Sequence, residues 1–167
     1  MLTDSCQRWR DRREYRVPTN VAYDLRQHEI VETKETKVAR AFIEQHHYSH
    51  AWPAARRKFL IYAAQTLARL PDPSSSIELQ RLVLLDHVGA NAETYMIARC
   101  NELLQRDGFS GVVTFADPVP RYDANGSKVF VGHIGTIYQA SNAVYVGRGS
   151  ARSLQLFQDG TVYSSQS

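Results

Sequence analysis

The chain has 167 residues, of which 43% are apolar and 22% charged, and its formal net charge is +3 at pH 7. These proportions are those of one ordinary globular domain, and they exclude wholesale disorder and collagen-like repeats. No segment approaches the roughly 20 consecutive apolar residues that a membrane-spanning helix requires, so we expect no membrane partner. Two cysteines are too few for a disulfide framework. With no secretory leader at its start, the sequence predicts a cytoplasmic protein of α/β or α+β class.

Arginine supplies most of the positive charge, and its planar fork suits phosphates and guanine edges. The first twenty residues mix arginines with aromatic side chains and show little apolar periodicity. We interpret residues 1–20 as a basic N-terminal arm and residues 21–167 as one domain. Such an arm can follow a nucleic-acid backbone, but a solvated chain terminus has the same composition. The candidate DNA-binding residues of the arm and of a second basic cluster are Arg8, Arg10, Arg12, Arg13, Arg56, Arg57 and Lys58.

Apolar periodicity predicts the order strand, helix, strand in the first part of the domain. Residues 21–30 alternate like a half-buried strand, and residues 33–45 place apolar side chains on one helical face, with Thr33 able to cap it. Pro53 and the loss of periodicity end this helix in the run HHYSHAWP. The apolar run 59–62 is typical of a short buried strand, and a loop follows at the Pro- and Ser-rich segment.

The middle of the chain predicts a strand, a turn and a helix. Residues 78–85 indicate a buried strand, and a helix is expected from Ala92 with Asn91 as its N-cap. Such a turn aims backbone N–H groups and a helix dipole at a bound anion, for example a pyrophosphate. An ordinary capped helix has the same pattern. The spacing of P-loop and Rossmann motifs is missing, which argues against a nucleoside triphosphatase and a dinucleotide-binding protein.

The last third of the chain predicts a strand, an excursion that is either a loop or a hairpin, a helix and a final hairpin. Residues 111–116 read as a buried strand, and residues 132–147 keep helical spacing after the excursion. The two short strands 154–157 and 161–163 flank Asp159-Gly160, which is a strong turn signal.

Several polar residues are candidates for chemistry. His46 and His50 have a spacing that suits metal ligands on a helix, although a histidine-rich loop is more often plain surface. His47 and Tyr48 can form an acid/base pair. Asp117 follows a predicted strand, where open α/β sheets bind ligands, or it simply closes a turn. Polar residues on the helix that follows suggest a lined pocket or surface hydrogen bonding: His133, Tyr138, Gln139 and Asn142.

Four segments together resemble a known family. They are HHYSHAWP, ELQRLVLLD leading into NAETYMIARC, VVTFADP, and GHIGTIYQASNAVYVG. Over roughly residues 21–163 the chain is similar to the phage Mom-like proteins, which have a GNAT (acetyltransferase-like) fold. The resemblance implies one domain with a mixed, mostly antiparallel central sheet flanked by helices. It implies an enzyme that adds an acetamido (carbamoylmethyl) group to adenine N6 in DNA and so protects phage DNA from host restriction.

The resemblance also implies site residues and partners. Its catalytic candidates are His47, Tyr48, Arg81, Asp117 and Tyr138. An acetyl-CoA donor would lie against the turn before the predicted helix, at Leu84, Leu85, Gly89, Ala90, Asn91, Ala92, Glu93, Thr94 and Asn142. Bound iron is a further expectation, with His46, His47 and His50 as candidate ligands. The partners would be double-stranded DNA and the acyl-CoA donor, in the cytoplasm of the host bacterium.

Two other functions remain open on the sequence. One is a GNAT-type N-acetyltransferase that acts on a small amine or a protein lysine. The other is a catalytically inactive DNA-binding relative, favoured by the short stretch between Lys58 and Glu78, where GNAT folds carry a two-stranded hairpin. Simple acyl transfer to adenine N6 would make an amide and not a carbon-linked acetamide, so the sequence leaves the mechanism open.

Overall fold

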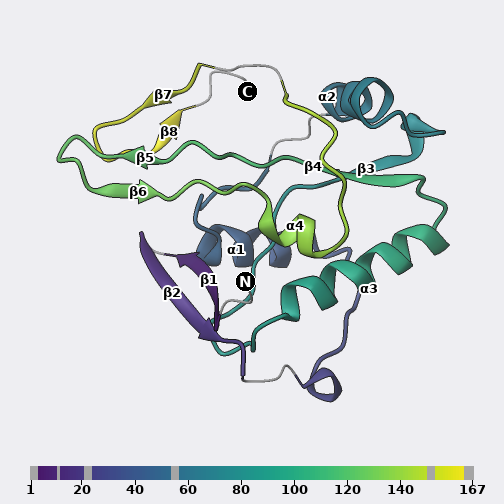
Figure 1. Cartoon of the computed structure of the whole chain (residues 1–167), viewed down its shortest axis with the longest axis horizontal. Coiled ribbons are helices and arrows are strands. Elements are labelled where there is room, and N and C mark those ends of the chain that lie inside the picture. The colour runs from purple at the N-terminus through teal and green to yellow at the C-terminus, as the bar shows by residue number, and fades with distance from the viewer. Residues whose placement is uncertain (1–3, 11, 21–23, 54–56, 150–152, 164–167) are drawn as a thin grey trace.

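The computed structural model describes residues 4–10, 12–20, 24–53, 57–149 and 153–163 (Figure 1). This is a mixed α/β chain, as expected, and its described strands pair two by two into three antiparallel hairpins and one parallel pair. A GNAT-like central sheet is therefore not confirmed. The described α-helices are α1 (Thr36–His46), α2 (Arg57–Tyr62), α3 (Ala92–Arg106) and α4 (Thr136–Ala140).

The basic N-terminal segment folds as an antiparallel hairpin of β1 (Ser5–Arg10) and β2 (Arg13–Pro18). Its anchor is Arg8, whose side chain is only 10% exposed. The Nε of Arg8 donates to Glu93 Oε1 over 2.7 Å, and its two Nη groups donate to the carbonyls of Val88 and Gly89 over 2.8 and 3.2 Å. Because these acceptors belong to the start of α3 and to the turn before it, the hairpin is held against that turn.

Two of the predicted strands in the first half are wrong. Within 21–30 the described residues form a 3₁₀ turn, Leu25–Gln27, capped by Asp24, while residues 21–23 lie outside the described part of the chain. The run 59–62 is helical, because four apolar residues alone cannot distinguish a strand from a buried helical turn. The helix predicted over 33–45 is confirmed as α1, and Thr33 Oγ1 accepts the N–H of Glu35 just before it.

The core lies where α2 meets the parallel pair. A π-helical turn, Ala63–Leu67, continues α2 and buries Ala63 and Ala64 against Val113 of β4, with leucines and Phe115 packed around them. The pair consists of β3 (Ser76–Leu79) and β4 (Gly111–Thr114), and α3 connects the two strands. The strand expected over 78–85 thus ends early. Residues 80–85 lead without strand pairing toward the turn before α3.

The last part of the chain forms two hairpins that lie side by side in Figure 1. They are β5 (Arg121–Tyr122) with β6 (Lys128–Phe130), and β7 (Gln155–Leu156) with β8 (Val162–Tyr163), so the excursion is a hairpin and the final hairpin is confirmed. The Ala124 N–H donates to the Gln158 carbonyl over 2.8 Å, which joins their turns. The helix expected over 132–147 shortens to α4, because Asn142 takes a left-handed φ of 62° and stops it.

Candidate functional site

A stack of three rings and a guanidinium connects distant parts of the chain. The His47 and Tyr48 ring centroids lie 4.1 Å apart, and Tyr48 stacks on Phe130 at 4.9 Å and 24°. The guanidinium of Arg121 lies 3.9 Å from the Phe130 centroid, and its Nη1 donates to Asp117 Oδ2 over 2.7 Å. We call His47, Tyr48, Phe130 and Arg121 the ring stack. It joins the end of α1 to the β5–β6 hairpin.

A backbone hydrogen bond and a glycine position His133 beside the ring stack. His133 donates its backbone N–H to the Asp117 carbonyl over 2.8 Å, which holds the segment after β6 against the segment after β4. Gly132 makes this approach possible at a φ of 76°, since a Cβ there would lie 2.6 Å from the Pro118 carbonyl oxygen. His133 then contacts Phe130 and Tyr138 edge-on, with centroids 6.3 and 6.2 Å apart.

The five predicted catalytic residues gather around this stack. His47 feels the positive charge of Arg81, and Tyr48 feels Arg81, Tyr138 and Asp117. Arg81 follows β3 and donates from Nη1 to the Gln80 carbonyl over 2.9 Å. The fold therefore brings together candidates from the end of α1, from the segments after β3 and β4, and from α4. Their roles in catalysis remain predictions.

Burial keeps both residues at the head of the stack uncharged at neutral pH. His47 is 5% exposed, and its burial, with the nearby charges of Arg81, His50 and His133, lowers its pKa to about 3. Burial raises the pKa of Tyr48 above its ordinary value, and the charge of Arg81 opposes this shift. The expected acid/base pair is thus a neutral imidazole packed on a neutral phenol.

Hydrogen bonds from Ser49 define the tautomer of His47. The Ser49 backbone N–H donates to His47 Nδ1 over 3.1 Å, and Ser49 Oγ lies 2.8 Å from the same nitrogen. A backbone N–H can only donate, so Nδ1 is the unprotonated acceptor and Nε2 carries the hydrogen. Because no buried side-chain nitrogen among the described residues lacks a partner, Nε2 lies where solvent reaches it. His47 therefore offers the site an N–H donor.

The three histidines proposed as iron ligands point to different partners. His46 packs on Phe42, with ring centroids 4.8 Å apart, and His50 Nδ1 lies 3.0 Å from the Glu44 carbonyl oxygen. His47 Nδ1 is occupied by Ser49. Within the described ranges, no three histidine, cysteine or acidic side chains form a group that could hold a metal ion. These residues do not fit the expected iron.

The predicted donor site lies at the turn before α3. Asn91 is the N-cap residue, but with a left-handed φ of 68° it makes no side-chain cap bond, so the expected capping is wrong in its chemistry. Ala90 and Ala92 are buried, and Thr94 Oγ1 donates to the Asn91 carbonyl over 2.9 Å. Leu84 and Leu85 precede this turn, and Asn142 follows α4, which contacts α3.

The predicted DNA-binding residues fall into two groups. Arg8 is turned inward by its bonds to the turn before α3, whereas Arg12 and Arg13 are exposed at the tip of the N-terminal hairpin. The remaining positions carry no described side chain: Arg10 lies in β1, Arg57 and Lys58 lie in α2, and Arg56 is outside the described residues.

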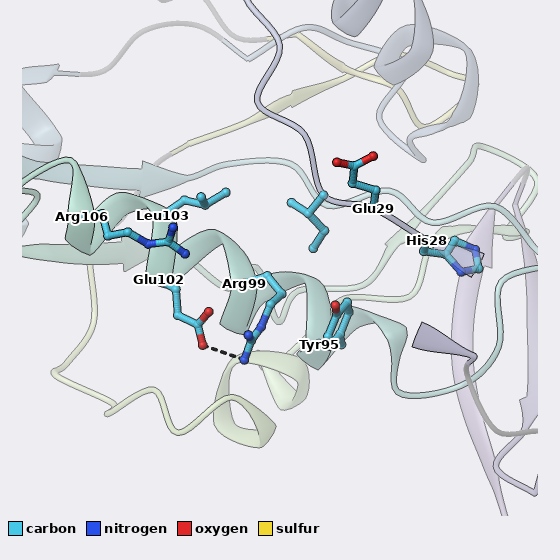
Figure 2. Close-up of a pocket in the computed structure, with 8 residues that line it drawn as sticks. His28, Glu29, Tyr95, Arg99, Glu102, Leu103 and Arg106 are labelled. Carbon is cyan, nitrogen blue, oxygen red and sulfur yellow. Dashed lines mark ion pairs between the residues drawn. The ribbon is translucent and has the colours of Figure 1, made fainter. Parts of the chain in front are cut away.

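A shallow pocket of about 290 Å³ lies elsewhere, between the extended residues 28–30 and α3 (Figure 2). Two residues of its lining, Arg99 and Glu102 of α3, form an ion pair with Nη2 and Oε1 2.6 Å apart. Its lining mixes both signs of charge and includes none of the predicted site residues. The candidate chemistry is therefore at the ring stack.

Sequence reasoning missed two members of the ring stack. Phe130 reads as one apolar residue of a short strand, and it is 4% exposed. Arg121 belongs to the excursion after Asp117. It lies four residues after Asp117, a spacing that predicts a side-chain contact only within a helix. Of the residues beside the stack, His133 could be found from the sequence, because it is one of several polar residues around a predicted helix.

A cluster of two neutral histidines and a neutral phenol, with an arginine–carboxylate pair at its edge, is the kind of site found in an enzyme. The profile of the Mom protein family matches residues 65–167, more than half of the chain, so the chain belongs to the Mom protein family. Membership makes it a bacteriophage DNA-modifying enzyme with a transferase-type activity. Neither a curated protein nor a solved structure matches the chain.

The family match covers some of the predicted catalytic residues and not others. Arg81, Asp117 and Tyr138 lie inside the matched residues, whereas His47 and Tyr48 precede them. The ring stack is thus one of the contacts, beside those of Arg8, through which the first part of the chain reaches the matched part. No helix in the described ranges is long and apolar enough to cross a membrane.

Proposed function

We propose that the protein adds an acetamido (carbamoylmethyl) group to N6 of adenine in DNA and thereby protects phage DNA from host restriction. The observation that carries this proposal is the convergence of five residues, far apart in sequence, on one ring stack: His47, Tyr48, Arg81, Asp117 and Tyr138. A GNAT-like ancestry of the fold is part of the same proposal.

The target base sets the physical requirements. The N6 lone pair is delocalised into the adenine ring, and the base must leave the duplex before any pocket can reach it. Tyr48 is already packed between His47 and Phe130, so base stacking falls to Tyr138, whose half-buried ring has one ring contact within the described residues, the edge of His133. The N–H at His47 Nε2 can then donate to a ring nitrogen of the extruded adenine.

The proposed donor is an acyl-CoA, with its pyrophosphate at the start of α3. The fifteen residues of α3 give a helix whose first-turn N–H groups have no partner within the helix. Small buried residues at 90 and 92 allow close approach, and Arg8 offsets the negative charge of Glu93 there. Because attack of N6 on a thioester carbonyl would give an amide, the CoA-linked donor would have to present its two-carbon unit through the methylene carbon, and the residues of the ring stack would orient the base toward that carbon.

The deciding experiment is nucleoside mass spectrometry. The protein is expressed in a bacterium, and the DNA of that bacterium is digested to deoxynucleosides. We expect a new adenosine with the added mass of an acetamido group; only unmodified adenosine, with the protein confirmed in the soluble fraction, would refute the proposal. Acetyl-CoA consumption without DNA would instead support the N-acetyltransferase alternative.

Single substitutions test the site within the same assay. Tyr138→Ala, which removes the ring proposed to stack on the base, and His47→Ala should each abolish the new nucleoside while DNA retention on a column stays intact, because neither residue is proposed to hold the phosphate backbone. Tyr145→Ala is the matched control, since Tyr145 is 77% exposed. Loss of DNA retention together with activity would show that the two residues support the fold and not the reaction.

A further inference from the structure

The imidazole of His133 makes contacts unlike those of His47. Among the described residues, it touches the rings of Phe130 and Tyr138 and has no side-chain hydrogen bond. In the described part of the chain no buried side-chain nitrogen lacks a partner, so the unbonded nitrogens of His133 are open to solvent. A histidine that is rigidly placed and accessible in this way can exchange a proton with a bound molecule.

A hydrogen bond and two glycines hold the backbone around His133 in place. Its N–H bonds the Asp117 carbonyl, and Gly132 on one side adopts a φ of 76° in a space that no Cβ would fit. Gly135 on the other side also adopts a φ of 76°, and a Cβ there would lie 3.0 Å from the Tyr138 ring. The imidazole and the Tyr138 ring therefore keep a set relationship.

Partial burial keeps His133 neutral at pH 7, with one charge of each sign beside it. Partial burial lowers its pKa below 6.5, Asp117 raises it, and Arg121 lowers it. His47 and Tyr138 are the other titratable groups beside it. The nearby carboxylate stabilises the imidazolium that proton uptake creates.

The other candidates for a base are occupied. His47 Nδ1 accepts from Ser49, which leaves a donor at Nε2. Asp117 is ion-paired with Arg121, and burial holds Tyr48 in its protonated form. His133 is the remaining neutral acceptor in the cluster of described residues.

We propose that His133 is the general base of the reaction, a deepening that rests on the proposed function. The N6 lone pair forms a bond to the methylene carbon of the donor's acetamido unit, X–CH2–CO–NH2, and the bond from that carbon to the carrier X breaks, so that X leaves with the electron pair. The nitrogen becomes acidic as it gains positive charge, and its proton passes to the free imidazole nitrogen of His133. Solvent later removes this proton, which restores the neutral imidazole.

The test compares His133→Asn with His28→Asn, an exposed histidine just after the 3₁₀ turn Leu25–Gln27. Nucleoside mass spectrometry of host DNA should show at least a 100-fold loss of product for His133→Asn and none for the control, the range expected for a lost general base. Circular dichroism and DNA retention should stay as in the wild type. A His133→Asn protein that keeps wild-type product levels would overturn the proposal.

Chemical rescue separates a base from a structural role. His133→Ala is assayed with plasmid DNA in a cleared bacterial lysate, which supplies the donor, with and without added imidazole. Rescue of product formation by imidazole is the expected result, and a folded variant that imidazole fails to rescue contradicts it. If the wild type makes no new nucleoside, the proposed function itself fails. Wild-type product with no effect at His133 removes only the general base.

Discussion

Two arginine–carboxylate pairs, each with a 2.7 Å contact, serve different purposes in this molecule. Arg8 binds Glu93 and uses its other N–H groups on the carbonyls of the turn before α3. Arg121 binds Asp117 and lays its guanidinium face on Phe130 in the ring stack. The first pair attaches a hairpin to the body of the protein, and the second extends a site. What an ion pair does is therefore decided by the remaining contacts of its arginine.

The comparison predicts that the two regions respond differently to disturbance. The hairpin region should lose stability when its pair is broken, because Arg8 and Glu93 are both largely buried. The site region should lose activity first, because Asp117 is 42% exposed and its pair contributes little to folding. Four predictions sharpen this contrast, from the largest expected effect to the smallest.

The largest expected effect is a loss of folding stability in acid, caused by His47 of the ring stack. His47 has a pKa of about 3 when folded and about 6.5 when unfolded, so between these values only the unfolded chain takes up the proton. Stability is complete above pH 6.5 and falls toward pH 3, by up to about 1.4 kcal/mol per pH unit. Urea unfolding at several pH values measures this slope, which His47→Gln should flatten and His87→Gln should leave unchanged.

Arg8→Ala should lower the free energy of unfolding by about 3 kcal/mol, because it leaves the Glu93 carboxylate and the turn carbonyls without their donor. The matched control is Arg16→Ala in the same hairpin, whose partner Glu14 is exposed; its cost should stay below about 1 kcal/mol. Equal losses for both variants in urea unfolding would contradict the anchoring role of Arg8.

Asp117→Asn should lower product formation about tenfold, the equivalent of about 1.4 kcal/mol, with a smaller change in stability. The amide keeps the shape but removes the charge that holds Arg121 over Phe130 and favours the His133 imidazolium. Titration of the His133 ring by NMR should show a lower pKa in this variant. An unchanged His133 titration would mean that the carboxylate does not act on the imidazole.

Ser49→Ala should have the smallest effect, about a threefold loss of product, because the backbone N–H still donates to His47 Nδ1. The ring should keep its hydrogen on Nε2, which ¹⁵N NMR of the histidine side chain detects directly. A shift of that hydrogen to Nδ1 would show that the hydroxyl alone selects the tautomer. Ser49→Thr, which keeps the hydroxyl, should restore wild-type product.

Long periodic segments and strong turns could be predicted from the sequence. The helix from Ala92 and the hairpin at Asp159-Gly160 are confirmed, because helical spacing and turn chemistry are local properties. The run 59–62 was predicted as a strand and is helical, since so few residues show no period. The short strand β3 ends where pairing with β4 ends, and that depends on a partner more than thirty residues away.

At the site, too, predictions could be made from local sequence patterns, whereas contacts between distant positions could not be predicted. The resemblance named residues that the structure brings together, but not the packing that joins them. Phe130 lies against Tyr48 across 82 positions of sequence, and a pair of such separation leaves no local pattern. The inward position of Arg8 was equally hidden, because an arginine in a basic segment has the same spacing whether it faces DNA or a carbonyl.

The contacts of the N-terminal hairpin also differ in the length of chain that they close. Arg8 meets partners 77 to 85 positions further along the chain, whereas Arg12 reaches the Asp159 carbonyl 147 positions away. Closing the longer loop costs more chain entropy. The contact of Arg8 with the turn before α3 therefore closes the cheaper loop. The contact of Arg12 ties the N-terminal hairpin to the C-terminal one at the greater entropic cost.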